Sequence, residues 1–270
     1  MAVDEAILEA SGRGLAHPTL RLYAWSPPCL SLGFRQPAAD IDIEALRSRS
    51  WDIVRRPTGG RSILHTDELT YSVCGPFSEP RLSGSVLESY RRLSAALLEA
   101  LHRLQIPAES HPELAKPPNE SNISIEEGVT GPVCFEVPSS YEITAKGKKL
   151  VGSAQSRKRE GVLQHGSLPL SGDLTRITQV LVFPVQGGSQ PGDETARERA
   201  ARRLLERAIT AEECLRRSLS WEQAAEAFTA GFSRALNLEL KAEELTNDEI
   251  RRAEELVRTK YGHPDWTGRV

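Results

Sequence analysis

The sequence lacks a long apolar run, a strong charge imbalance and a basic leader segment. Its longest apolar run, Val180–Phe183, is far shorter than the roughly 20 residues that cross a bilayer, so we expect no membrane partner. The net charge of −3 gives no reason to expect nucleic acid as a partner either. The opening MAVDEAILEA has acidic residues and no basic residue. It does not read as a signal peptide, and we expect a cytoplasmic protein.

The sequence is also poor in cysteine and has no recognisable metal-ligand spacing. Its cysteines are widely scattered and show no CxxC motif, so we expect reduced thiols rather than a disulfide scaffold. The two histidines that attract interest, His65 and His165, form no ligand spacing with other residues. We therefore expect neither a metal nor a cofactor. The cysteines are Cys29, Cys74, Cys134 and Cys214.

Helix-like and strand-like segments follow one another without strict strand–helix–strand alternation. This order predicts an α+β fold with a mixed or antiparallel sheet flanked by helices and a helical C-terminal portion. We expect a catalytic core over 1–190, continuing to about 235, and a helical extension over 191–270 packed on it. Residues 107–131, rich in Pro, Glu, Asn and Ser, are expected to form a mobile loop, and Pro184–Asp193 a linker.

The individual elements are predicted from periodicity and from capping boxes. A core-facing stripe that includes Val86 and Tyr90 is expected on the helix over 85–104. Helices are also expected at 3–10 and 41–48, and from about 173 onward, where Ser171 or Asp173 starts the first. Strands are expected at 20–25, 51–56, 62–65, 69–74, 133–137, 141–144, 149–156 and 162–170. The capping boxes are Ser85/Glu88, Thr210/Glu213, Ser220/Gln223 and Thr246/Glu249.

The segment Arg55–His65, RRPTGGRSILH, is the most unusual stretch. A glycine pair between two strands lets the backbone approach a ligand closely and direct N–H groups at it. The flanking Arg55, Arg56 and Arg61 carry charge suited to a phosphate or a carboxylate. A tight hairpin turn with solvated arginines explains the same spacing equally well, and both interpretations stay open.

A second segment, Gly147–Gln155, ends in small residues that leave room for a ligand beside the strand. A lysine that points inward from such a strand is able to hold an acyl carbonyl or to stabilise a thiolate. A solvated hairpin tip made of Lys146, Lys148 and Lys149 is the more common situation.

Cys134, in PVCFEVP, and the two histidines have open roles when each is taken alone. A cysteine in an apolar strand is usually inert core filling, and a nucleophile needs a lowered pKa, for which a nearby ammonium is one cause. His65 and His165 fit a general base or a ligand-orienting donor, but structural histidines are the commoner case.

Together these segments resemble the biotin/lipoate protein ligase superfamily, and within it the lipoate–protein ligase A and octanoyltransferase family. Arg55–His65 looks like the RRxTGGxxxxH signature, Lys149–Ala154 like KxxGSA, and Gln164–Leu168 like the strand with HG[ST]L. The interval of 15 residues from Cys134 to Lys149 resembles the cysteine-dependent octanoyltransferases of Gram-positive-type bacteria.

This resemblance implies that octanoyl-acyl carrier protein acylates Cys134, and that the acyl group then passes to a lysine of a lipoyl domain, such as the glycine-cleavage H protein. Lys149 would lower the pKa of Cys134 and orient the acyl carbonyl. No ATP is needed, and a monomer is the default expectation. The implied substrate-binding residues are Arg56, Thr58, Gly59, Gly60, His65, Gly152, Ser153, Ala154, His165 and Gly166.

Three other functions stay open at this point. An ATP-dependent lipoate–protein ligase shares the glycine loop and the lysine, although the helical tail counts against it. An amidotransferase that moves octanoyl between lipoyl domains would use the same cysteine. A non-catalytic binder of acyl groups or lipoyl domains would have no reason to retain both Cys134 and Lys149.

Overall fold

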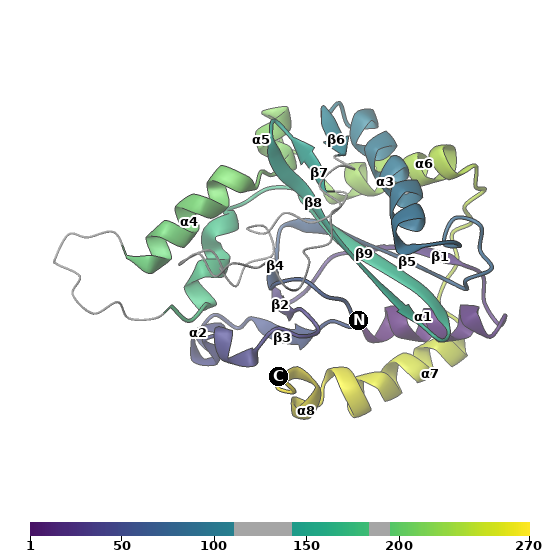
Figure 1. Cartoon of the computed structure of the whole chain (residues 1–270), viewed down its shortest axis with the longest axis horizontal. Helices are drawn as coiled ribbons and strands as arrows, with labels where there is room; N and C mark the ends of the chain where they lie inside the picture. The colour runs from purple at the N-terminus through teal and green to yellow at the C-terminus, as the bar shows by residue number, and fades with distance from the viewer. Residues whose placement is uncertain (111–141, 184–194) are drawn as a thin grey trace.

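The computed structural model describes residues 1–110, 142–183 and 195–270, and within them two β-sheets are flanked by helices (Figure 1). All neighbouring strands of the larger sheet are antiparallel, in the order β1-β5-β9-β8-β7-β6. Its strands are β1 Thr19–Tyr23, β5 Glu68–Gly75, β6 Ala108–Ser110, β7 Ile143–Ala145, β8 Lys148–Lys158 and β9 Gly161–Pro169.

The smaller sheet has the order β3-β2-β4 and mixes both kinds of pairing. Strand β2 (Cys29–Leu32) runs parallel to β3 (Asp52–Arg55) and antiparallel to β4 (Ile63–His65). The α+β prediction with mixed and antiparallel strands is therefore confirmed. The short elements beside this sheet are η1 Ala38–Asp40 and α2 Ile43–Ser48.

The central strands β5 and β9 are buried almost throughout and have two different faces. Successive side chains of a strand point to opposite faces, so alternate residues share an environment. One face is apolar and packs on α3 (Val86–Arg103) and α6 (Trp221–Leu236), where Tyr71 lies against the rings of Phe228 and Phe232. The other face has polar side chains along its middle: Thr70, Ser72, His165 and Ser167.

Four helix starts in the described residues follow the predicted capping boxes, because each box satisfies amide groups that the first turn leaves unpaired. All four predicted boxes form both of their hydrogen bonds, and Thr195 with Glu198 forms a further one at the start of α4. Asp173 caps η4, which is a 3-10 helix. These helices are α4 Ala196–Arg207, α5 Ala211–Leu215, α7 Asn247–Leu256 and η4 Leu174–Val180.

Two local predictions are wrong. Val86 was expected to face the core but is 50% exposed, because it lies in the first turn of α3, beyond the sheet that buries the later turns. Part of the expected loop over 107–131 is a strand, since 108–110 pairs with β7 as β6. The rest of that loop, the predicted strand over 133–137 and the linker Pro184–Asp193 lie outside the described residues.

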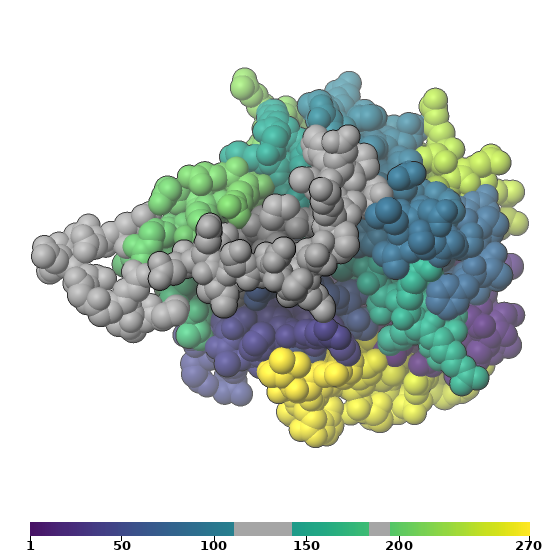
Figure 2. All heavy atoms as spheres, in the orientation of Figure 1, coloured from purple at the N-terminus to yellow at the C-terminus, as the bar shows by residue number. Residues whose placement is uncertain are grey.

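The C-terminal segment lies along α1 (Ala2–Gly12) and continues to the small sheet; Figure 2 shows it in yellow along the lower side. Two ion-pair groups hold it there, one between Arg252 and Glu9 at 2.7 Å and one between Lys260 and Glu5 at 2.6 Å. No helix in the described part of the chain is long and apolar enough to cross a membrane. The segment comprises α7, the π-helical turn η5 Val257–Tyr261 and α8 Pro264–Thr267.

Arg55 joins the end of the chain to the small sheet. Its side chain is fully buried and donates to the carbonyl oxygens of Thr267 at 2.6 Å and of Gly33 at 2.7 Å. Trp266 donates back to the carbonyl of Arg55 at 2.8 Å. The C-terminal segment therefore holds the strand that leads into the glycine segment.

Arg55→Ala should lower the free energy of unfolding by about 3 kcal/mol, because it leaves several buried carbonyl groups without donors. Urea denaturation measures this loss. The control Arg49→Ala removes an exposed guanidinium that donates to Gln179 and to the carbonyl of Ala45 at the surface, and should change stability by less than about 0.5 kcal/mol. Equal losses in the two variants would contradict the anchoring role of Arg55.

Candidate active site

Two adjoining cavities lie where the glycine segment meets β8 and β9. The outer cavity, of about 890 Å³, is lined by the glycine segment, the start of α3, Lys149 and the small residues of β8. A narrow inner recess shares Ser153 and Ala154 with it and is lined by both β8 and β9. Every predicted site residue except Cys134 lines one of the two cavities or bonds to a residue that does; Cys134 lies outside the described residues. The outer cavity has Gly59, Gly60 and Lys149, and the recess has Arg56, Gly152, His65, His165 and Gly166.

The glycine segment is a tightly packed loop whose shape needs its glycines. Gly60 has a φ of 92°, a conformation that residues with a side chain rarely adopt. The loop also touches β2's end, because a Cβ on Gly33 would lie only 1.8 Å from the carbonyl oxygen of Gly60. Thr58 accepts from the backbone N–H of Phe34 at 2.8 Å and fixes the other side of the loop.

The buried side chain of Arg56 holds the glycine segment in its shape through hydrogen bonds to backbone carbonyl groups. Its guanidinium donates to the carbonyl oxygens of Gly59 at 2.8 Å, of Arg61 at 2.7 Å and of Ser31 at 3.0 Å. The alternative of a turn with solvated arginines is therefore wrong for Arg55 and Arg56, which are both buried. Since both guanidinium groups bond to the chain itself, the expected binding of an anion by their charges stays a prediction.

The three lysines of the β7–β8 hairpin have different environments. Lys146 and Lys148 extend outward and donate to backbone carbonyls of α5 and α4, respectively. Lys149 is only 5% exposed, lines the outer cavity and places its Nζ 2.7 Å from Oε1 of Glu142. The interpretation as a solvated hairpin tip is therefore wrong for Lys149.

His65 is the centre of a buried polar network. Its Nε2 lies 2.7 Å from Oγ of Ser31, and its Nδ1 lies 2.6 Å from Oε1 of Glu68. Thr70 also donates to Glu68, and the Trp25 ring stacks on the imidazole at 4.5 Å. Sequence reasoning missed Ser31 and Glu68 as site residues, because only the pairing of β2 with β4 brings Ser31 beside His65.

His165 is a buried, neutral imidazole that lines the recess. Burial lowers its pKa from 6.5 to about 3. Its Nε2 lies 2.6 Å from Oγ1 of Thr58. Within the described residues, neither its Nδ1 nor the buried Oγ of Ser167 has a hydrogen-bond partner. Both residues lie on the same face of β9 and line the recess, where their unpaired atoms are candidates to bond a polar atom of a ligand or a water molecule.

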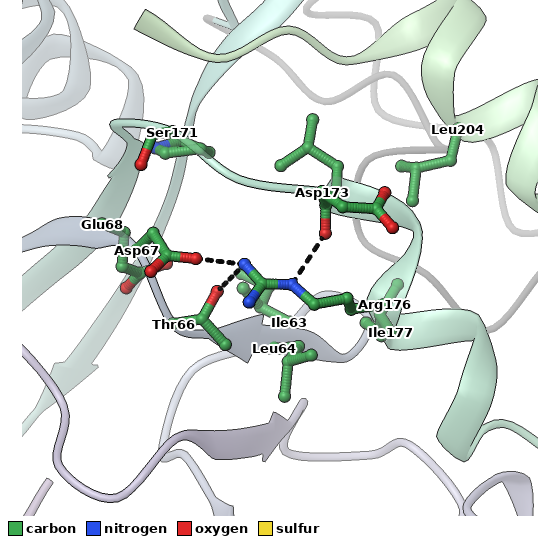
Figure 3. A pocket seen from close by; sticks show the side chains of 12 residues that line it. Ile63, Leu64, Thr66, Asp67, Glu68, Ser171, Asp173, Arg176, Ile177 and Leu204 are labelled. Atoms are coloured by element: carbon green, nitrogen blue, oxygen red, sulfur yellow. Dashed lines mark hydrogen bonds and ion pairs between the residues drawn. The ribbon is translucent and has the colours of Figure 1, made fainter. Parts of the chain in front are cut away.

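A separate pocket beneath the β4–β5 turn is too small for an acyl chain. Figure 3 shows Arg176 crossing it, with its guanidinium bonded to Asp67, to Thr66 and to the carbonyl of Asp173. The cavity measures only about 40 Å³, whereas small-molecule sites usually enclose roughly 300–1,000 Å³. Arg176 instead holds the turn that leads into Glu68 of the histidine network.

The three cysteines in the described residues are unsuited to nucleophilic catalysis. All are buried, and burial raises the pKa of each: to about 12 for Cys29, well above the ordinary value for Cys74, and upward for Cys214. A thiol with a raised pKa supplies little thiolate at neutral pH. A raised pKa therefore argues against three of the four cysteines as the nucleophile, and Cys134 is the cysteine to which this argument does not apply.

Gly33→Ala should displace the glycine loop, because the added Cβ would collide with the Gly60 carbonyl. We expect a loss of about 2–3 kcal/mol in the free energy of unfolding, measured by urea denaturation. The matched variant Gly59→Ala meets no atom within 4 Å and should change stability by under about 1 kcal/mol. A Gly33→Ala protein as stable as Gly59→Ala would contradict the close packing.

The buried neutral His165 should make the fold sensitive to acid. The unfolded state takes up the proton near pH 6.5 and the folded state only near pH 3. The contribution of His165 to the free energy of unfolding is therefore fully present above pH 6.5 and is lost progressively as the pH falls toward 3. One such group contributes a slope of up to about 1.4 kcal/mol per pH unit.

In His165→Asn this part of the slope should disappear, as measured by denaturant unfolding from pH 7 to 4. The control His17→Asn, at an exposed position, should keep the slope of the unaltered protein. An unchanged slope in His165→Asn would show that the imidazole is not buried in its neutral form.

Comparison with known proteins gives a family match and full-length relatives. The model of the lipoyl protein ligase A/B catalytic domain matches residues 1–233. Octanoyltransferase LipM of Kyrpidia tusciae is 42% identical over 270 residues, covering 100% of this chain and 93% of the relative. Octanoyltransferase LipM of Brevibacillus brevis is 38% identical over 267 residues, covering 98% of this chain and 92% of the relative.

Solved structures share the fold at low sequence identity. A bipartite lipoate protein ligase from Thermoplasma acidophilum, solved in a study that includes its E2 lipoyl domain, aligns with a TM-score of 0.75 at 22% identity and covers 100% of this chain and 91% of its own. Lipoate-protein ligase A bound with ATP aligns with a TM-score of 0.74 at 23% identity, covering 100% and 93%. The helices and the antiparallel sheet match those of lipoate ligases.

Proposed function

The chain belongs to the lipoyl protein ligase A/B catalytic domain family, and we propose that it moves an octanoyl group from a carrier thioester, through Cys134, to a lysine of a lipoyl domain. It is an octanoyltransferase of lipoate biosynthesis, like its full-length relatives. The observation that carries the mechanism is the buried Lys149 on the wall of a cavity of about 890 Å³, opposite the glycine loop.

In the first step, the Cys134 thiolate attacks the carbonyl carbon of octanoyl-acyl carrier protein. The bond from carbon to the carrier sulfur breaks, the carrier leaves as a thiol after taking a proton, and an octanoyl thioester forms on Cys134. The Lys149 ammonium favours the thiolate over the thiol and orients the carbonyl oxygen. Backbone N–H groups of the glycine loop supply further donors for the oxyanion.

In the second step, the amine of a lipoyl-domain lysine attacks the acyl-enzyme. An amide forms, the bond to sulfur breaks, the amine loses a proton, and the Cys134 thiol is restored. A thioester is higher in free energy than an amide, so the reaction needs no ATP. We propose the glycine-cleavage H protein as the acceptor, the cytoplasm as the location and a monomer as the working form.

The outer cavity, of about 890 Å³, is large enough for an acyl chain that enters by Lys149, whereas the recess measures only about 30 Å³. The chain would run from the outer cavity past Ser153 and Ala154 toward the recess. Its six or so methylenes, at about 0.8 kcal/mol each, would contribute about 5 kcal/mol of binding. Arg56 acts on this site through the loop that it holds. Thr58, Gly152 and Gly166 shape the recess.

The test is intact-protein mass spectrometry after mixing the enzyme with octanoyl carrier protein in the absence of ATP. We expect an octanoyl adduct that an apo lipoyl domain removes. Cys134→Ser should form no thioester and should lower transfer by about three orders of magnitude or more, because the covalent route is lost. Cys214→Ser, at a buried cysteine with a raised pKa, should still acylate.

Two outcomes would replace this proposal with one of the alternatives. Modification of the acceptor only with free octanoate and ATP, unchanged in Cys134→Ser, would indicate a ligase. An adduct formed only from an octanoylated lipoyl domain would indicate an amidotransferase.

A further inference from the structure

We infer that Glu142 is a positioning residue for acyl transfer, which holds the Lys149 ammonium at the wall of the outer cavity. The inference rests on the proposed function and adds to it a residue with no role so far. The two side chains form an ion pair, with 2.7 Å between Nζ and Oε1.

The hairpin geometry brings the two residues together. Thr144 on β7 is paired with Lys149 on β8, so their side chains lie on the same face of the hairpin. Glu142 precedes Thr144 by two residues, just before β7 begins, and its carboxylate reaches the Lys149 ammonium. Residues that lie diagonally across from each other in a hairpin are close enough for two long side chains to touch. A register shift between Ile143 and Thr144 adjusts the alignment at this point.

Both partners are almost completely removed from water. Lys149 is 5% exposed and Glu142 is 9% exposed. A buried ammonium is retained only where an opposite charge and hydrogen bonds replace its hydration. The other lysines of this hairpin reach backbone carbonyls at the surface, so Lys149 alone of the three combines burial with a carboxylate partner.

The backbone of Lys149 is also held in place, so only its side chain is free to change conformation. Its carbonyl oxygen accepts from the N–H of Ile209 at 3.1 Å, and it forms a parallel bridge with Ala208, just after α4. Strand β7 pairs with it on the other side. Four rotatable bonds separate Cα from the ammonium, and the contact with Glu142 restricts them.

The chemical consequence follows from charge and direction together. An ammonium has three N–H donors, and Glu142 accepts one of them at short distance. The carboxylate pairs with the ammonium charge in a dry site and sets the directions of the other N–H groups. Both properties are needed to stabilise a thiolate and to orient a thioester carbonyl. Glu142 therefore acts on the reaction through Lys149 and need not touch the substrate.

The experiment compares Glu142→Gln, Glu142→Ala and Glu142→Asp in single-turnover acylation by octanoyl carrier protein, followed by mass spectrometry. Gln keeps the shape but not the charge, and Asp keeps the charge on a shorter stem. We expect Gln and Ala to lower the maximal acylation rate by about tenfold or more, with the donor concentration at half-maximal rate unchanged, and Asp to recover part of it. The control Glu44→Gln breaks an exposed ion pair of the same 2.7 Å length, with Arg47, and should acylate normally.

A purely structural role would lower stability but leave the acylation rate of the folded protein unchanged, so each variant's melting temperature is measured alongside. If Glu142→Gln acylates at the unaltered rate while Lys149→Met does not, the inference is overturned and the proposed function stands.

A second measurement does not depend on acyl transfer. Trace acetylation with acetic anhydride, quantified by peptide mass spectrometry, reports how readily Lys149 reacts as a neutral amine. Its labelling relative to the exposed Lys241 should rise at least about threefold in Glu142→Gln, because the carboxylate that pairs with its Nζ is gone. Equal labelling in both proteins overturns the inference. If the enzyme forms no adduct with the carrier thioester, the proposed function fails. The ratio of Lys149 to Lys241 labelling still decides whether Glu142 holds the Lys149 ammonium.

Discussion

The buried guanidinium groups of Arg55 and Arg56 bond to backbone carbonyls, and the arrangement of the active site depends on these bonds. Arg55 ties the C-terminal segment and the end of β2 to β3. Arg56 draws the carbonyls of the glycine loop and of β2 around one side chain. An arginine offers five donors in a rigid fork and cannot lose its charge, so it is suited to fix irregular backbone in a dry interior. The loop can therefore form one wall of a cavity without regular secondary structure of its own.

The second constraint is the alternation of side chains on β5 and β9. One face buries apolar residues against α3 and α6, while the other has His165, Ser167 and Thr70 where the small sheet approaches. Buried polar groups are stable only when they are hydrogen-bonded, and the network around His65 satisfies this condition. Among the few buried side-chain atoms without a hydrogen-bond partner in the described residues, Nδ1 of His165 and Oγ of Ser167 belong to residues that line the recess. A folded core thus includes a polar recess beside an acyl-sized cavity.

The sequence was sufficient for the parts of this arrangement that depend on local chemistry. The capping boxes located the helix starts, since the hydrogen bonds concerned lie within four residues. The glycine pair and the small residues of β8 identified both walls of the cavity. Contacts between distant segments could not be predicted from the sequence. Ser31 contacts His65 only through the pairing of β2 with β4, and Arg55 contacts Thr267 only when the chain is folded. Val86 was misplaced because helical periodicity does not reveal where the covering sheet ends. The role of Cys134 rests on its motif and on the family.

The central claim is that the acyl group lies between the glycine loop and β8, with its carbonyl beside Lys149. A crystal structure with a non-hydrolysable octanoyl thioester analogue tests this claim most directly. The account predicts density for the analogue's carbonyl within hydrogen-bond distance of Lys149 Nζ, and for its alkyl chain past Ser153 and Ala154 toward His165. An alkyl chain bound elsewhere, or a carbonyl oriented away from Lys149 at the recess end, would contradict it.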